Sequence, residues 1–395
     1  MTLKTTPATM KSITLNQLQL PENIIVFSHL RWDFVYQRPQ HLLTRFAADF
    51  KITLIEEPIF DTAGPAFYNL TPKEKNINVI VPHMPQGLSP EEVNQVQKSL
   101  LDDYMKGKQL SNYAFWYYTP MALEFSRKHM PEIVIYDCMD ELSAFKFAPD
   151  SLKALEQELL SKADVVFTGG QSLYQAKKNQ HANIHPFPSS IEVEHFAQTR
   201  ELKALTPVQK DQPLTLGFYG VIDERFNINL IKEMADARPE WQFNLIGPVV
   251  KIDPATLPQN SNIKYLGPKS YKELPAQMAS WDIALIPFMI NESTRFISPT
   301  KTPEYLAAGL PVISTAIRDV VNPYGIKQLV YIGNTAEEFV AAAEQELSKS
   351  ASIKQSWLKK VDSFLSQNSW SKTYQAMLKL TKQVLIDKAN TSIAQ

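Results

Sequence analysis

The chain has 395 residues, of which 44% are hydrophobic and 21% are charged, so it is globular and long enough for two domains of ordinary size. Its formal net charge of −1 gives no overall positive field, and we therefore expect no nucleic-acid partner. Cys138 is the only cysteine, which excludes an intrachain disulfide and a thiolate metal cluster and indicates a reducing, cytoplasmic context.

The first part of the chain has the pattern of a doubly wound α/β domain. We interpret residues 1–20 as an extension, because they have neither the apolar core of a signal peptide nor the length of a membrane span. Continuous apolar runs, typical of parallel strands buried on both faces, follow at 24–27, 52–55, 79–81, 115–118, 133–136 and 165–168. Helical patterns lie between them at about 40–48, 90–105, 120–129 and 149–162. The alternation predicts right-handed parallel crossovers, and we assign residues 1–196 to this domain.

A second α/β series follows a polar segment. Residues 197–213 contain two prolines and show no apolar periodicity, so we interpret them as a linker. Strand patterns return at 214–219, 243–246, 263–266, 283–286, 312–313 and 329–331, which assigns residues 214–370 to a second domain. Residues 371–395 contain a last helix whose apolar stripe needs a surface to bury against. Two such domains in succession indicate a cleft between them and favour an enzyme.

A short helix near residue 303 carries the clearest local signal. Thr302 can cap a helix over about 303–308, with Pro303 in the first position, where a missing N–H costs nothing. Gly309 suits the left-handed closing position, and Pro311 prevents continuation. A buried strand then begins at Val312.

The residues around this helix start suggest a nucleotide site. Free N–H groups, the helix dipole and the adjacent Lys301 attract an anion such as a diphosphate. Glu304 can accept two hydrogen bonds from a vicinal diol such as a ribose. The alternative is an ordinary helix with a solvated glutamate and lysine, and these residues alone do not decide between the two.

The same stretch resembles the donor-site segment of bacterial glycosyltransferases with the GT-B fold, through Lys301, Glu304–Tyr305 and the run at 307–312. The resemblance covers most of the chain from residue 24 to residue 370. It implies an α/β fold of two Rossmann-like doubly wound domains facing each other across a cleft, with the C-terminal helix returning to the first domain. It also implies that Glu304 binds the ribose of a nucleotide-sugar, and that Thr300 and the helix start hold the diphosphate. Many retaining members carry a second glutamate where this chain has Phe296, so the stereochemical outcome stays open.

Four further positions in the second domain match the donor side of the family. Gly220 and Arg225 follow the first strand of this domain, in a loop that lies beside the donor diphosphate in the family. Gly247 ends the next strand, near the place of the nucleobase, and Lys269 is similarly placed one strand later. Alternatively, Arg225 pairs with a neighbouring carboxylate and Lys269 is solvated.

The first domain is expected to hold the acceptor and a general base. An acceptor hydroxyl loses its proton during attack, and Asp140 and Asp137 follow a strand end that faces the cleft, where carboxylates could take it. Asp140 ranks before Asp137, which could instead cap the following segment, and His29 and Asp33 are rivals. In the same loop as these rivals, Arg31 and Arg38 could bind an anion, and Trp32 could stack on a sugar ring.

The resulting expectation is a glycosyltransferase of the hexosyltransferase type that uses no cofactor and no metal. It would move a sugar from a nucleotide-diphosphate sugar, with UDP-sugar favoured, to a glycan or lipid-linked acceptor in cell-surface polysaccharide or glycoconjugate synthesis. Peripheral contact with the inner face of the cytoplasmic membrane and the oligomeric state stay open. The alternatives are a nucleotide-sugar epimerase and a non-catalytic nucleotide-sugar-binding protein. An oxidoreductase is not expected, because no G-x-G-x-x-G follows any strand.

Overall fold

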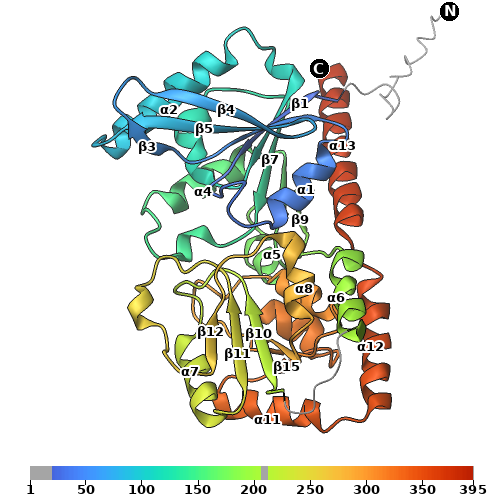
Figure 1. Ribbon diagram of the computed structural model, residues 1–395. Helices are drawn as coiled ribbons and strands as arrows, with labels where there is room; N and C mark the ends of the chain where they lie inside the picture. The colour runs from blue at the N-terminus through green and yellow to red at the C-terminus, as the bar shows by residue number, and fades with distance from the viewer. Residues whose placement is uncertain (1–19, 206–211, 395) are drawn as a thin grey trace, which may run out of the picture.

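The computed structural model describes residues 20–205 and 212–394, which form two β-sheets stacked one above the other and covered by helices (Figure 1). Except for its last residue, the extension expected at 1–20 lies outside the described residues. We call the unit built on the upper sheet of Figure 1 the first domain and the unit built on the lower sheet the second domain.

In residues 20–205, the first domain has nine strands in the order β3-β5-β2-β1-β6-β7-β8-β9, with β4 paired to β5. Only the β4–β5 pair is antiparallel. The strands are β1 (Asn23–Phe27), β2 (Lys51–Ile55), β3 (Ile59–Thr62), β4 (Phe67–Glu74), β5 (Ile77–Pro85), β6 (Tyr113–Tyr117), β7 (Ile133–Cys138), β8 (Val165–Thr168) and β9 (Ile184–Pro186). The helices are α1 (Arg38–Phe46), α2 (Pro90–Met105), α3 (Leu123–Ser126), α4 (Leu152–Lys162) and α5 (Gln171–Lys177).

Each apolar run predicted as a strand of this domain is one, whereas β3, β4 and β9 were not predicted. Most side chains of β3 and β4 are exposed or half-buried, so these strands lack the continuous apolar pattern of a central strand. The helix predicted at 120–129 is shorter: a 3₁₀ turn at Pro120–Ala122 precedes α3.

The second domain has six parallel strands in the order β12-β11-β10-β13-β14-β15. They are β10 (Thr215–Tyr219), β11 (Gln242–Ile246), β12 (Ile263–Tyr265), β13 (Ile283–Ile286), β14 (Val312–Ser314) and β15 (Tyr331–Ile332). The helices of this domain are α6 (Val193–Leu205), α7 (Ile228–Ala237), α8 (Leu274–Met278), α9 (Lys301–Ala307), α10 (Arg318–Val320), α11 (Ala336–Leu347) and α12 (Ala351–Leu365).

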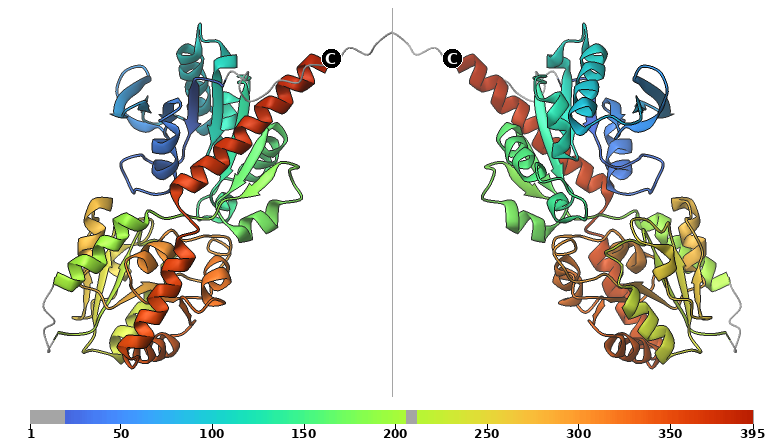
Figure 2. Two further views of the ribbon diagram at one scale, coloured as in Figure 1. Left: turned by 90° about the vertical axis from the view of Figure 1, so that its right-hand side faces the viewer. Right: turned by 90° about the vertical axis from the view of Figure 1, so that its left-hand side faces the viewer.

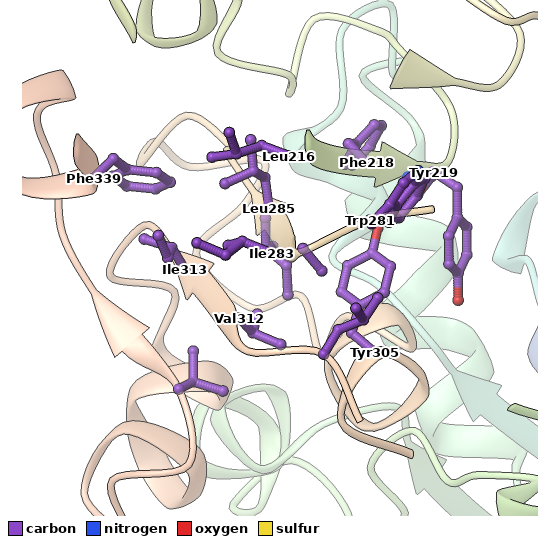
Figure 3. Close-up of a cluster of buried hydrophobic side chains, with 14 of the residues drawn as sticks. Leu216, Phe218, Tyr219, Trp281, Ile283, Leu285, Tyr305, Val312, Ile313 and Phe339 are labelled. Carbon is purple, nitrogen blue, oxygen red and sulfur yellow. Dashed lines mark hydrogen bonds between the residues drawn. The ribbon is translucent and has the colours of Figure 1, made fainter. Parts of the chain in front are cut away.

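Trp281 is fully buried in the hydrophobic core of the second domain. Figure 3 shows side chains of β10, β13, β14 and α9 meeting in this cluster, with Trp281 and Tyr305 next to each other. Gly217 in β10 makes room for the indole, because a Cβ at this position would lie 1.9 Å from the Trp281 ring. The packing fixes α9 against the sheet and so holds the residues at its N-terminus in place.

The segment predicted as a linker at 197–213 is helical as far as Leu205, and this part of the prediction is wrong. The helix α6 buries Phe196 and Thr199, and the Thr199 hydroxyl donates to the carbonyl oxygen of Pro275 at 3.1 Å. With so few buried side chains, α6 has almost no apolar periodicity to detect. Residues 206–211 lie outside the described part of the chain.

The last helix, α13 (Trp370–Ala394), runs back along the side of the molecule to the first domain (Figures 1 and 2). Trp370, Tyr374, Met377 and Leu385 belong to the same buried cluster as Phe46 of α1. The apolar stripe of this helix therefore completes the core of the first domain.

Two polar contacts also join the domains. The carboxylate of Asp319 in α10 accepts hydrogen bonds from the N–H groups of Gln171 and Ser172, at 2.8 and 2.9 Å, and so caps α5 of the first domain. The hydroxyl of Ser189 donates to the carbonyl oxygen of Ser298 at 2.7 Å.

Candidate active site

A cavity of about 780 Å³ lies between the two sheets. In the first domain it is lined by residues that follow β1, β7, β8 and β9 and by Glu74 at the end of β4. In the second domain it is lined by residues at or after the ends of β10, β11, β12 and β13. The carboxyl ends of both parallel sheets therefore face one space, which is where α/β sheets bind ligands.

The N-terminus of α9 forms part of the second-domain wall, but the helix begins earlier than predicted. Thr300 is the N-cap residue, and the first hydrogen bond of the helix runs from the N–H of Glu304 to the oxygen of Thr300 at 3.4 Å. Thr302 is not the cap, and its buried hydroxyl has no hydrogen-bond partner in the described residues. Pro303 is tolerated in the third position because N–H groups in the first turn have no partner within the helix. Gly309 has φ +76°, which confirms the left-handed position.

Glu304 lines the cavity and is only 4% exposed, so it is not the solvated side chain of the plain-helix alternative. The hydroxyl of Tyr219 donates to its Oε2. Burial raises the pKa of Glu304 to about 7, while the Tyr219 hydrogen bond and the charge of Lys301 oppose this rise. The second carboxylate oxygen, Oε1, forms no hydrogen bond with the described residues, which leaves it available to a ligand.

Lys301 reaches the cavity through a gap left by a glycine. Its Nζ lies 5.7 Å from the ring centres of Phe218 and Phe288, and burial lowers the pKa of Lys301 to about 8. A Cβ at Gly220, where φ is +141°, would lie 2.2 Å from Lys301 Cε. A Cβ at Gly247 would in turn lie 1.8 Å from the carbonyl oxygen of Gly220. The two glycines thus allow the loops after β10 and β11 to pack together beside Lys301.

The other predicted donor residues of the second domain also line the cavity, but they differ in pairing and in exposure. Arg225 pairs with Asp223 at 2.6 Å, as the alternative interpretation held, and its guanidinium lies 5.3 Å from the ring centre of Phe145 in the first domain. Lys269 is exposed at the edge of the cavity, and Thr300 is half-buried.

Of Asp140, Asp137 and His29, the first three candidates for the general base, Asp140 alone lines the cavity in the described part of the chain. Its carboxylate forms no hydrogen bond or ion pair with the described residues, and burial raises its pKa. Arg225 and Arg38 are the cations that oppose this rise. A carboxylate without a partner and with a raised pKa is suited to accept a proton.

Asp137 and His29 do not line the cavity, so neither is retained as the proposed base. Asp137 is fully buried and accepts hydrogen bonds from Nε and Nη2 of Arg38 at 2.8–3.2 Å. Burial lowers the pKa of His29 to about 4, which makes it a weak base. The rival Asp33 lines the cavity and pairs with Lys73.

The arginines of the first loop are also engaged within the protein. Arg38 lines the cavity, but its Nη1 donates to the carbonyl oxygen of Phe187 at 2.7 Å while its other two nitrogens hold Asp137. Arg31 pairs with Glu56 at 3.1 Å and does not line the cavity. Trp32 lines the cavity, as its proposed stacking role requires.

Glu192 and two tyrosines were missed by the sequence analysis. Glu192 lines the cavity and accepts hydrogen bonds from Arg45 at 2.8 Å and from the Tyr271 hydroxyl at 3.1 Å. Tyr271, which could be taken as helix packing, also lines the cavity and stacks on Tyr36 with ring centres 4.6 Å apart. These residues come from distant parts of the sequence, so no local pattern could have joined them.

Phe296 packs against a buried cluster of the first domain and places no carboxylate there.

None of the helices in residues 20–205 and 212–394 is long and apolar enough to cross a membrane. Within the same residues, no group of three or more histidine, cysteine, aspartate and glutamate side chains could hold a metal ion.

Residues 214–349 match the family described as Glycosyl transferases group 1. The putative teichuronic acid biosynthesis glycosyltransferase TuaH of Bacillus subtilis is 26% identical to the chain over 253 residues, which cover 59% of this chain and 63% of that protein. The chain thus matches less than two thirds of the length of this curated relative.

Two solved structures have a similar fold along almost the whole chain. Sucrose-phosphate synthase from Thermosynechococcus elongatus has a TM-score of 0.69 at 13% identity, over 92% of this chain and 99% of that chain. The trehalose-6-phosphate structure from E. coli, bound with UDP-2-fluoro glucose, has a TM-score of 0.66 at 12% identity, over 91% and 99%. The predicted fold class is thereby confirmed. The chain has the GT-B fold of two Rossmann-like domains, and residues 214–349 of its second domain are similar to the glycosyl transferases group 1 family.

Proposed function

We propose that this protein is a metal-independent glycosyltransferase of the hexosyltransferase type, which moves a sugar from a nucleotide-diphosphate sugar to a hydroxyl acceptor. The observation that carries the proposal is the buried Glu304 beside Lys301, at the cavity wall of a group 1 domain. A UDP-sugar is favoured because a structural neighbour is bound with UDP-2-fluoro glucose. A role in cell-surface polysaccharide synthesis is suggested by the relative named for teichuronic acid biosynthesis.

The donor is placed on the second domain. Glu304 accepts hydrogen bonds from the ribose hydroxyls, and the ammonium group of Lys301 neutralises the diphosphate as it leaves. Arg225 and Lys269 add positive charge on the same wall. Closure of the domains over both substrates would exclude water and limit hydrolysis of the donor.

The acceptor is placed against the first domain, with Asp140 as the general base. A general base contributes roughly 10²- to 10⁴-fold, so Asp140→Asn should lower turnover by at least ~10²-fold. Donor affinity should survive, because Asp140 lies on the wall opposite Glu304. Near-normal turnover of this variant, measured by mass spectrometry of the product, would move the base to Asp33, the other candidate that lines the cavity.

The donor assignment is tested by calorimetric titration of UDP, GDP and ADP into wild type and Glu304→Ala. A hydrogen bond to a charged group contributes about 1.5–3 kcal/mol, so loss of the carboxylate should weaken the best nucleotide at least ~10-fold. Glu233→Ala, an exposed change on α7, is the control and should leave affinity unchanged. A 2′-deoxy nucleotide should lose affinity for wild type but lose little more for Glu304→Ala. Equal binding of the best nucleotide by wild type and Glu304→Ala would refute the assignment.

A further inference from the structure

The charged residues that line the cavity are divided by sign between its two walls. The second-domain wall carries four cations and one carboxylate: Arg225, Lys269, Lys272, Lys301 and Glu304. The wall made by the first domain, with the segment that leads into α6, carries four carboxylates and one cation: Asp33, Glu74, Asp140, Glu192 and Arg38. Three of these charges are paired within the protein: Asp33 with Lys73, Glu192 with Arg45 and Arg225 with Asp223. Among the described residues, the carboxylates of Glu74 and Asp140 on the first-domain wall form no ion pair. An anionic group inside the cavity is therefore repelled by the first-domain wall and attracted to the lysines of the second.

Arg38, the one cation that the described residues place on the first-domain wall, is already paired within the protein. All three guanidinium nitrogens of Arg38 donate to the buried Asp137 or to the carbonyl oxygen of Phe187. The nearby Arg31 does not line the cavity and is held by Glu56. No side chain on this wall is thus free to pair with a phosphate, within the described residues.

The second-domain wall is different in this respect. Lys269, Lys272 and Lys301 line the cavity without an ion pair to any described residue, so they are available to the phosphates of a ligand. Three aromatic residues line the first-domain part of the cavity: Trp32, Phe34 and Tyr36. Aromatic faces bind the C–H surface of a sugar without requiring charge.

We propose that the acceptor of this enzyme presents an uncharged or amino-bearing sugar to the cavity, and that the first-domain wall rejects phosphorylated acceptors. This inference rests on the proposed function and deepens it, because it names the acceptor class. In the transfer, the acceptor oxygen bonds to the anomeric carbon as the bond from that carbon to the diphosphate oxygen breaks. The acceptor proton passes to Asp140, and the diphosphate leaves with the electron pair toward Lys301.

The test uses the full chain saturated with its best-binding nucleotide, and it compares glucose, glucosamine and glucose 6-phosphate as probes of the acceptor wall. We expect glucose 6-phosphate to bind at least ~10-fold more weakly than glucose, and glucosamine at least as well as glucose, because like charges repel across a desolvated site. The difference in affinity between glucose and glucose 6-phosphate should become smaller at high salt, because dissolved ions screen the repulsion. Glucose 6-phosphate binding as tightly as glucose would overturn the inference.

A charge variant makes the same test in the opposite direction. Glu74 is an exposed carboxylate on the first-domain wall, and Glu74→Lys should improve binding of glucose 6-phosphate relative to glucose by several-fold. Asp103→Lys, an exposed change of equal charge on α2 outside the cavity, should leave this ratio unchanged. If the ratio of glucose 6-phosphate affinity to glucose affinity were the same in Glu74→Lys and Asp103→Lys, the first-domain wall would not select acceptors by charge. Failure of UDP, GDP and ADP all to bind wild type would instead refute the donor assignment of the proposed function.

Discussion

Removal of one hydroxyl, in Tyr219→Phe, should move the pH range over which nucleotides bind. Tyr219 donates to Glu304, whose pKa burial has raised to about 7. Among the described residues, the other titratable or charged groups coupled to this carboxylate are Lys301 and Tyr305 on its own helix, Glu192 and Tyr271. Only the ionised carboxylate accepts two ribose hydrogen bonds, so affinity should rise with pH through about 7 in wild type.

The expected size of the effect follows from the energy of the lost hydrogen bond. A bond to a charged group contributes about 1.5–3 kcal/mol, and its loss raises the pKa of Glu304 further and weakens the ionised form. At pH 7 the variant should bind the nucleotide at least ~10-fold more weakly than wild type. The difference in nucleotide affinity between wild type and variant should become smaller by about pH 9, where the carboxylate ionises in both proteins.

The same pKa predicts a direction for the stability of the unliganded protein. Because burial raises the pKa of Glu304 from 4.5 to about 7, the folded protein favours the neutral carboxyl. The stabilisation by the neutral Glu304 carboxyl is fully present below pH 4.5 and is lost as the pH rises through about 7.

Calorimetric titration from pH 6 to pH 9 measures the binding effect. The ratio of wild type to variant is the quantity to compare, because the pKa of Lys301 is about 8 and its loss of charge affects both proteins alike. Tyr305→Phe is the matched control: the Tyr305 hydroxyl accepts from the N–H of Tyr219 at 2.9 Å and does not contact the carboxylate. A Tyr219→Phe profile that coincides with wild type would show that the hydroxyl does not position Glu304.

Three further changes test the support of the site. Gly220→Ala should displace Lys301 and lower nucleotide affinity, whereas Gly64→Ala, where a Cβ meets nothing closer than 3.8 Å, should leave it unchanged in the same titration. Trp370→Ala should lower the free energy of unfolding by about 3–5 kcal/mol in urea, because this fully buried side chain joins α13 to the first domain. Asp319→Ala should cost about 0.5–2 kcal/mol in the same experiment, because it uncaps α5, and a cost near zero would mean that this contact does not stabilise the domain pair.

The sequence was most informative where burial alone determines the structure. The strands β1 and β13 are buried along nearly all their length, so they appear in the sequence as continuous apolar runs that are easy to recognise. Strand β4 and helix α6 expose most of their side chains, and their patterns carried too little apolar contrast to identify them.

Within the site, local motifs were predictable and long-range pairings were not. Glu304 and Lys301 belong to one short segment, and both line the cavity. Asp137 and Asp140 had nearly the same sequence setting, but Asp137 lies inside β7 and pairs with Arg38, 99 residues away. That distant partner, which the sequence does not reveal, distinguishes the buried, paired carboxylate of Asp137 from that of Asp140, which lines the cavity.

The position of α13 constrains the order in which the chain can fold as it is synthesised. Multidomain proteins commonly complete their N-terminal domain first. Here part of the first-domain core is supplied by residues from Trp370 to Leu385, which leave the ribosome only after the whole second domain has been made. Until then the apolar surface around Phe46 stays uncovered and is open to chaperones or to aggregation. The second domain should therefore reach its native state before the first. A truncation that removes α13 should expose the core of the first domain, although that domain lies at the other end of the sequence.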